Sequence, residues 1–539
     1  MLFLVMLPWE GYSQYTNEWV RPGQVYYRIP VVKKGIYKLT HSDLQNAGVP
    51  VSAIAPQLVQ LFHRGKEQAI FVKGQSDGVL NTDDYIEFFG QANDGTLDKT
   101  LYKSSTSQPH NYYNLFSDTT AYFLTWSLGA VPGKRVTFFD EVNVTNIPKE
   151  VFHNEERLII NQTQYAGGVT VNDILQYTHF DMGEGWTGNA VIQGQSVDYT
   201  INLVNNIETG SGNPQLEILL VGRDNISHTA EIFVGSSSGA LRSVGAHIFG
   251  GFETVKVSLP LNWSDIGTDG KLIVRLAAPS ATTNRPQFSA SYLKLTFPQN
   301  FQSVGLTEKI FYLPAKPTGK SYVEWDAAPS IMRVWDVTDP TAIVSIGTRT
   351  SGNQLTAMVG ASETPRTLYT FTSTTTPSLK KVSFRLIDPV QSDYIIISNK
   401  VLMKPALIYS DPVKAYAGYR ASSEGGAYDT LLVTMDQLYN QFNYGETSPV
   451  AIYEFMRFMV GKGQPKYLFL IGKGRDVNAG FHRLMNPGPE VLKDLVPSAG
   501  MPGSDMNFTI GLAGTTYEPA VPTGRLSVTK PAEVANYLN

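Results

Sequence analysis

The sequence predicts a multidomain protein that is mostly β-sheet, with β-sandwich or jelly-roll-like domains followed by the start of an α/β domain. Three observations lead to this prediction. Aromatic residues make up 11% of the chain and charged residues only 17%, and 47 Gly and 31 Pro punctuate it. Short runs of aromatic and β-branched residues recur between these turn residues before position 400. Beyond it, apolar strands alternate with helical patterns, which is typical of α/β domains.

Composition also excludes several classes of protein. The chain has 539 residues, a net charge of −4 and no cysteine. It therefore holds no disulfide, no thiolate metal site and no cysteine nucleophile. The mildly acidic balance gives no electrostatic basis for binding nucleic acid, and we expect no such partner. A hydrophobic content of 42% at low net charge excludes a disordered chain.

Residues 1–13 are interpreted as the remnant of a signal peptide. The apolar run 2–7 is followed by Gly11-Tyr12-Ser13, which places small residues where signal peptidase reads, with cleavage before Gln14. The basic segment that usually opens a signal peptide is missing, and a buried strand is the alternative. No later run reaches 18 apolar residues, so we expect no transmembrane span in the mature chain.

Residues 14–155 are predicted to form an N-terminal β-rich domain. The runs 26–32 and 36–39 flank the turn residues Lys34-Gly35 and predict a hairpin. Ser42 and Asp43 open a short helix that Gly48 ends. Further strands are expected at 58–62, 69–72, 85–89 and 121–126.

Two more β-domains are expected after this one. In 156–300, strand-like runs recur at the spacing typical of a β-sandwich: 196–203, 215–221, 230–234, 253–259, 271–277 and 291–297. In 301–400, a third β-domain is predicted from the runs 321–325, 331–337, 342–346, 354–359, 366–372 and 394–398.

Residues 401–539 are predicted to be a partial α/β domain. A helix is expected over 413–423, a strand over 428–434 and a short helix over 435–442. Ser448 and Pro449 then start an amphipathic helix that ends at Gly461. The apolar run 467–471 is typical of a parallel strand covered on both faces. Because a final helix follows Thr529 with few strands in place, we expect the domain to continue beyond Asn539.

Two glycine-rich motifs have structural and chemical interpretations. The segment 235–239 has the G-x-S-x-G pattern of a nucleophile elbow, but no helix follows it, so a hairpin turn is favoured. The segment 472–475, Gly-Lys-Gly-Arg, follows a strand and could hold an anion. Val477 stands where a dinucleotide fingerprint needs its third glycine, so a loop at a strand end is favoured.

The candidate metal ligands are the oxygen-bearing side chains near residue 80. Calcium is the candidate cofactor, because Asp77, Asn81, Asp83 and Glu87 offer such ligands at short spacing. The alternative is turn chemistry, in which these side chains bond their own backbone. The eight histidines show no zinc-binding spacing, and His482 is interpreted as a loop residue.

Five tryptophans could stack on sugars, but core packing is the favoured interpretation. They are Trp126, Trp186, Trp263, Trp325 and Trp335.

The C-terminal segment resembles the gingipain-type cysteine peptidases, and the whole layout resembles the sortase-like members of that family in type IX protein secretion. The order of the matching stretches across nearly the whole chain carries the resemblance. They are 35–39, 84–90, 183–186, 334–340, 428–434, 442–445, 449–452, 465–472 and 523–528.

The resemblance implies a caspase-like α/β fold, of which this chain holds the first half, and a His–Cys dyad in which imidazole deprotonates the thiol. The family's histidine lies in a Gly-His-Gly-like turn and its cysteine follows the next strand. This chain has neither a His-Gly dipeptide nor a cysteine, so no catalytic residue is assigned. Lys473 also stands where the family often has the acid of Gly-Asp-Gly.

The implied function is that of an exported cysteine peptidase at the outer-membrane surface or outside the cell. It would process the C-terminal sorting domains of cargo proteins and act with other outer-membrane components of type IX secretion. Two alternatives stay open. One is a non-catalytic adhesin or secretion scaffold with a degenerate peptidase domain. The other is a secreted glycan-binding protein, which requires a row of exposed aromatic residues.

Overall fold

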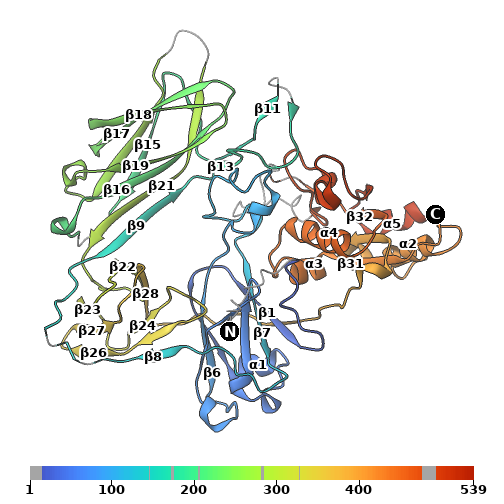
Figure 1. Cartoon of the computed structure of the whole chain (residues 1–539), viewed down its shortest axis with the longest axis horizontal. Coiled ribbons are helices and arrows are strands. Elements are labelled where there is room, and N and C mark those ends of the chain that lie inside the picture. The colour runs from blue at the N-terminus through green and yellow to red at the C-terminus, as the bar shows by residue number, and fades with distance from the viewer. Residues whose placement is uncertain are drawn as a thin grey trace, which may run out of the picture.

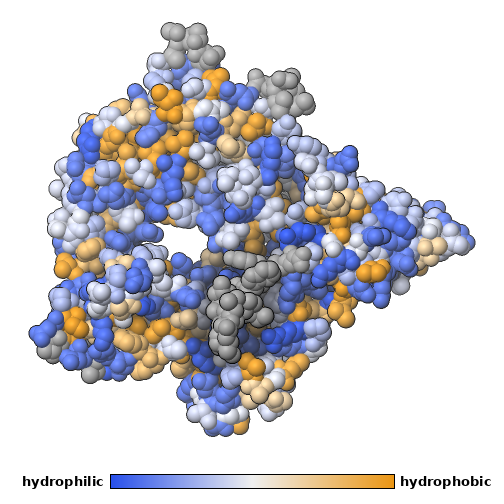
Figure 2. All heavy atoms as spheres, in the orientation of Figure 1, coloured by the Kyte–Doolittle hydropathy of each residue, from blue (hydrophilic) through white to orange (hydrophobic). Residues whose placement is uncertain are grey.

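The computed structural model of the chain describes residues 15–141, 143–144, 146–171, 175–203, 207–280, 285–326, 328–475, 477 and 493–539. The expected signal peptide lies outside these residues, as does His482. Three β-rich units and an α/β unit occupy separate regions of the molecule (Figure 1). Figure 2 shows an opening between the sandwich above and the β-rich units below it. None of the helices in the described ranges is long and apolar enough to cross a membrane.

The N-terminal unit consists of two sheets packed on one core. One sheet has the order β29-β1-β7-β3-β4 and the other β2-β6-β5. Their strands are β1 (Tyr26–Val31), β2 (Gly35–Thr40), β3 (Val59–His63), β4 (Lys66–Gln68), β5 (Phe71–Val72), β6 (Tyr85–Gly90), β7 (Thr120–Trp126) and β29 (Lys380–Val382). Ile29, Leu39, Leu61 and Phe88 lie in the shared core. The helix α1 (His41–Asn46) starts at a capping box between Thr40 and Asp43.

The predicted hairpin over 26–39 is wrong. Strand β1 pairs with β7 and β29, whereas β2 pairs with β6, so the two strands belong to different sheets. The residues Lys34-Gly35 therefore connect a strand of one sheet to a strand of the other. Turn residues mark where one strand ends and the next begins, but they do not determine which strands form hydrogen bonds with each other.

The second unit is a β-sandwich. One sheet contains β15 (Ser196–Asn202), β20 (Lys271–Ala277), β17 (Ser227–Ser237) and β18 (Ala240–Gly250) in that order. The facing strands are β14 (Val191–Ile192), β16 (Gln215–Gly222), β19 (Thr254–Pro260) and β21 (Gln287–Gln299). Alternate residues such as Ile218, Ile232 and Val274 fill the space between the sheets. The motif 235–239 lies in the β17–β18 hairpin, in agreement with the interpretation as a turn.

The third unit shares a ten-stranded sheet with the sandwich. The shared strand is β9 (His153–Ile160), which pairs with β21 and also, at Asn154, with β22. The sheet continues through β22 (Glu308–Leu313), β28 (Arg366–Phe371), β24 (Arg333–Asp336), β25 (Val344–Ile346) and β8 (Thr137–Phe139). A small sheet packs against it around Trp325, with strands β23 (Ser321–Asp326), β27 (Gln354–Val359) and β26 (Thr348–Ser351). Strand β9 thus crosses the position 155/156, at which we expected a domain boundary.

Short two-stranded ladders connect the sandwich to the rest of the molecule. They pair β10 (Gln164–Ala166) with β13 (Gly185–Thr187), and β11 (Thr170–Val171) with β12 (Leu175–Gln176).

The α/β unit is a parallel four-stranded sheet covered on both faces. The order is β31 (Thr430–Thr434), β30 (Tyr394–Ser398), β32 (Tyr467–Ile471) and β33 (Thr523–Leu526). Ile395 and Leu468 face α3 (Met435–Phe442) and α4 (Val450–Lys462), where Phe455 packs on them. Residues one position later, Ile396 among them, face α2 (Pro412–Ala421) and α5 (Pro531–Leu538). Burial of both faces explains why these strands are uniformly apolar.

The structure corrects one assignment at the start of this unit. The run 394–398, which we expected in the third β-domain, is β30 and lies between β31 and β32 in the parallel sheet. Its uninterrupted apolar sequence already has the character of a parallel strand. Helix α4 begins at Val450, one residue later than predicted, and the Ser448 hydroxyl accepts a hydrogen bond from its first N–H.

Candidate functional site

The carboxyl edge of the parallel sheet is the place where ligands bind in open α/β folds. Here β30 and β31 end at Ser398 and Thr434, and β32 and β33 end at Ile471 and Leu526. In the sheet, β31 lies on one side of β30, and the next strand in the sequence, β32, lies on the other side. The edge therefore contains a topological switch between β30 and β32.

The half of this edge next to β32 and β33 is filled by protein. Arg525 donates from Nη1 to the carbonyl oxygens of Gly472 and Val496, each at 2.6 Å. Its Nε and Nη2 also pair with Asp505 at 2.7 and 2.6 Å. The guanidinium thus ties the loop after β32 to the segment that begins at residue 493.

The candidate anion site at Gly472–Arg475, for which a plain loop is the favoured interpretation, is not formed as an open cradle. The Arg475 amide donates to the Asp494 carboxylate at 3.0 Å, and the Lys473 amide donates to the carbonyl of Val528. A Cβ at Gly474 would lie 2.5 Å from the Ser498 hydroxyl. The loop packs closely, which agrees with its interpretation as a connection after a parallel strand.

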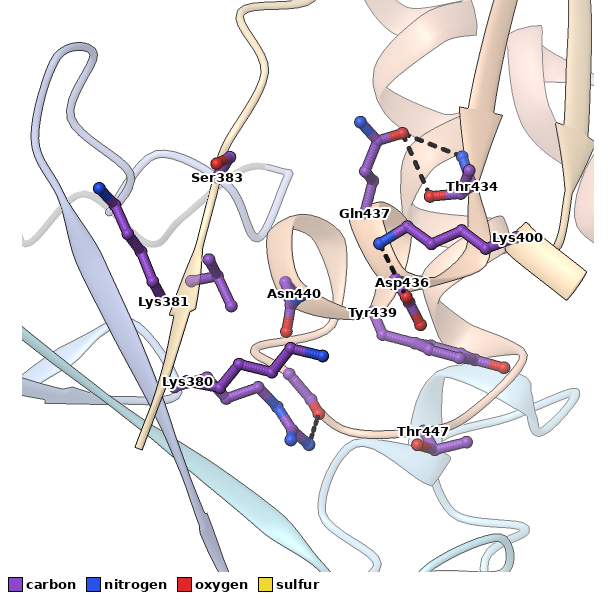
Figure 3. Close-up of a pocket in the computed structure, with 13 residues that line it drawn as sticks. Lys380, Lys381, Ser383, Lys400, Thr434, Asp436, Gln437, Tyr439, Asn440 and Thr447 are labelled. Carbon is purple, nitrogen blue, oxygen red and sulfur yellow. Dashed lines mark hydrogen bonds and ion pairs between the residues drawn. The ribbon is translucent and has the colours of Figure 1, made fainter. Parts of the chain in front are cut away.

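The half next to β30 and β31 opens into a cavity of about 470 Å³. We call it the basic pocket. It lies between this edge and strand β29 of the N-terminal sheet (Figure 3). The lining residues come from four separate parts of the chain: Arg28, Lys380, Lys381, Val382, Ser383, Lys400, Thr434, Asp436, Gln437, Tyr439, Asn440, Gly445 and Thr447.

Positive charge dominates the basic pocket. Arg28 and Lys380 are register partners on β1 and β29, so their side chains share a face. Lys380 extends toward Asn440, whereas Lys381 extends to the other side of β29 (Figure 3). Lys400 pairs with Asp436 at 3.0 Å. Burial lowers the pKa of Arg28, and the negative charges of Asp436 and Glu446 oppose that change.

The first turn of α3 forms one wall of the pocket. Thr434 ends β31, and its backbone N–H donates to the Gln437 side chain at 3.0 Å in a capping box. The sequence therefore turns directly from strand to helix at the carboxyl edge. This turn exposes Asp436 at the mouth of the pocket and leaves Asn440 one helical turn further in.

The loop between α3 and α4 forms the opposite wall, and it is fixed by a buried ion pair. Glu446 is fully buried and accepts from Arg64 Nε at 2.7 Å and from the Thr120 hydroxyl at 2.8 Å. Arg64 also pairs with Asp94 at 2.6 Å. Burial raises the pKa of Glu446, while Arg64 and Thr120 favour its charged form. Arg28 adds a hydrogen bond from Nη2 to the carbonyl of Gly445 at 2.8 Å.

The candidate calcium ligands are not brought together. Asn81 donates to Asp77 at 2.8 Å, as expected for a polar turn, and Asp83 pairs with Lys73 at 2.8 Å. Glu87 is buried within β6 and pairs with Arg333 of the third unit at 2.8 Å. Within the described ranges, no three His, Asp or Glu side chains cluster as metal ligands.

The five tryptophans do not form an exposed platform. Trp186, Trp325 and Trp335 are buried, and Trp126 and Trp263 are half-buried. Packing into cores is thus confirmed as the role of Trp186, Trp325 and Trp335, and these tryptophans offer no platform for stacking on sugars.

Sequence reasoning missed the basic pocket, because its cations are distant from one another in the chain. Arg28 and Lys380 meet only when β29 adds to the N-terminal sheet, and that sheet then faces the α/β unit. The one available signal was local: Lys380-Lys381 interrupts an otherwise uncharged stretch just before the α/β unit.

Comparison with known proteins supports the resemblance. Residues 387–539 match the family described as Peptidase family C25. A search of the curated proteins finds no match. Among solved structures, dimeric latent PorU from Porphyromonas gingivalis is similar, with a TM-score of 0.60 and 15% sequence identity. The match covers 95% of this chain and 48% of that one.

Two carbohydrate-binding structures match a smaller part of the chain. They are the CBM36-1 domain of a multidomain xylanase from the hindgut metagenome of Trinervitermes trinervoides and the module CBM36 in complex with calcium and xylotriose. Each covers 26% of this chain, at 16% and 12% identity, and the matches cover 96% and 98% of those chains. Both TM-scores are 0.17, so this likeness carries no argument. The fold of this chain is that of about half the PorU structure, and residues 387–539 match peptidase family C25.

Proposed function

We propose that this chain belongs to an exported cysteine peptidase of the sortase-like kind that acts in type IX secretion. Such an enzyme removes C-terminal sorting domains from cargo proteins at the outer-membrane surface. The observation that carries the proposal is the match of residues 387–539 to peptidase family C25, within a chain that has a PorU-like fold over 95% of its length.

The chain itself supplies no cysteine nucleophile, the group on which the family's acyl-enzyme chemistry depends. Its contribution is the first four strands of the α/β sheet and the β-rich units attached to them. We propose that the β-rich units position the peptidase unit and its protein substrates.

The test starts from the reading frame beyond Asn539. A His-Gly turn followed by a cysteine at the end of the next strand is expected there. In cells that carry the full reading frame, replacement of that cysteine by alanine is expected to leave cargo proteins with uncleaved C-terminal sorting domains. Normal processing in that variant would contradict the proposal.

A non-catalytic scaffold is the second candidate, and one observation favours it. Lys473 replaces the acid that the family often has after this strand, and its loop is closed by backbone hydrogen bonds. A reading frame without the cysteine would support this alternative. In that case, deletion of the gene would impair secretion or adhesion, whereas point variants of histidine residues would leave both unchanged.

A further inference from the structure

We propose that the basic pocket binds a phosphate monoester, with Arg28, Lys380 and Lys400 as its cationic ligands. This proposal is independent of the peptidase function, because it concerns a site between the N-terminal sheet and the α/β unit.

The first argument is the balance of charge. Four cations line the cavity, Arg28, Lys380, Lys381 and Lys400, and they oppose one acid, Asp436. Because Lys381 extends to the other side of β29, the side chains that face the cavity carry an excess of two positive charges. Lys380 has no ion-pair partner in the described part of the chain. A phosphate monoester carries a charge of about −1.5 to −2 at neutral pH, which matches this excess. A carboxylate would neutralise only half of it.

The second argument is the set of donors. The Arg28 guanidinium is planar and offers several N–H groups, and within the described residues one of them donates to the carbonyl of Gly445. Its pKa is lowered by burial, so an anionic ligand would restore the lost solvation of the charge. Asn440 and Thr447 add neutral polar groups to the same cavity. Charged donors that converge with neutral ones are the usual means of holding phosphate oxygens.

The third argument is rigidity. Strand β29 is held in the N-terminal sheet by its ladder with β1. The opposite wall is held by the Glu446–Arg64 ion pair. The backbone of both walls therefore stands in place before a ligand arrives, which limits the entropy lost on binding.

A second cavity of similar size does not have this charge excess. It measures about 480 Å³ and lies between residues 17–24 and 384–389. Its walls mix acids and bases, such as Glu18 and Asp388 with Arg21 and Arg385, and include the exposed Leu386. The charges there nearly balance, so it offers no comparable attraction for an anion.

Isothermal titration of the purified chain with glycerol 3-phosphate tests the proposal. We expect saturable binding that weakens roughly tenfold in Lys380→Gln and in Lys400→Gln, because each substitution removes a charged hydrogen bond to phosphate. The matched control is Lys404→Gln, which changes an exposed lysine outside the pocket and should bind like the unaltered chain. Asp436→Asn should bind several-fold more tightly, since it removes the opposing charge.

Two further arms identify the source of the phosphate. Vesicles of phosphatidylcholine with a minor fraction of phosphatidic acid, compared with soluble glycerol 3-phosphate, show whether the group is reached on a lipid surface or in solution. Stronger binding to the vesicles identifies a lipid headgroup as the ligand, and stronger binding to glycerol 3-phosphate identifies a soluble phosphate monoester. Both outcomes support the proposal. The proposal is overturned if neither glycerol 3-phosphate nor the phosphatidic acid vesicles bind, if acetate competes equally, or if Lys380→Gln and Lys404→Gln behave alike.

Discussion

Individual buried charges hold the N-terminal sheet against the α/β unit. Glu446 has no exposed side-chain surface, and it contacts Arg64 and Thr120 of the N-terminal unit. Two buried charges are costly to desolvate, so the pair stabilises the interface only while both partners are present.

Glu446→Ala is therefore expected to lower the free energy of unfolding by about 3 kcal/mol, because Arg64 would keep a buried charge with Asp94 as its remaining partner. Chemical denaturation by urea measures the change. Asp83→Ala is the control, since its pair with Lys73 is exposed and should contribute nothing measurable. Equal effects of the two substitutions would contradict this account.

Glu184 makes stability depend on pH. It is fully buried between the sandwich and the loops around Tyr102, and burial raises its pKa from 4.5 to about 8. Tyr165 and the Asp181 amide donate to its two carboxyl oxygens, which only partly offsets that rise.

The folded state thus binds a proton at Glu184 that the unfolded state has released between pH 4.5 and 8. Its contribution to stability is complete below pH 4.5 and falls as the pH rises toward 8, by up to about 1.4 kcal/mol per pH unit. Glu184→Gln removes this slope, because an amide does not titrate and the Tyr165 hydroxyl can turn to accept its N–H.

Urea denaturation of both proteins from pH 5 to 8 provides the measurement. Three histidines titrate in the opposite sense, because desolvation lowers their pKa values to about 3 for His63, 4 for His110 and 3 for His153. Because the unaltered chain and Glu184→Gln contain the same histidines, the difference between their free energies of unfolding is free of the histidine contribution. A stability difference that does not change with pH would refute the role assigned to Glu184.

At the scale of elements, the loop between α3 and α4 packs closely against the face of the N-terminal sheet. Gly445 has a φ of +81°, and a Cβ there would lie 2.6 Å from the Ala121 side chain and 2.9 Å from Phe123. The close approach lets Tyr444 join an aromatic cluster with Trp19 and Phe62.

Gly445→Ala is expected to destabilise the chain by about 1–3 kcal/mol more than Gly78→Ala. Gly78 has a φ of +82° but nothing within 4 Å of its Cβ position. Gly78→Ala therefore measures the cost of the backbone strain without a steric contact. Thermal denaturation of the two variants isolates the effect of the contact. Equal losses would show that the loop can move away from the sheet at little cost.

The helices and strands that the sequence predicted well are those that form because of signals within their own residues. The run 467–471 became β32 and the run 435–442 became α3, because an apolar run and a capping box are local signals. Strand pairing depends on residues far apart in the chain. Strand β1 pairs with β7 and not with β2, and β30 pairs with strands that follow it in the sequence. The basic pocket depends on such pairing, so its cations could not be recognised together in the sequence.

For the whole molecule, the absence of cysteine gives a direct expectation. The purified 539-residue chain should not hydrolyse peptide substrates, since it has no thiol to form an acyl-enzyme. Assays with a panel of fluorogenic peptides would test this. Turnover that survives repurification and persists with thiol-blocking reagents would refute it.

Strand β9 has a mechanical consequence for the whole molecule. It belongs to the sandwich through its ladder with β21, and it reaches the third unit through β22. Tension applied between the two units would therefore load hydrogen bonds along one shared strand in shear, with no loose linker to extend first. The two units should resist pulling as one body and keep a fixed separation.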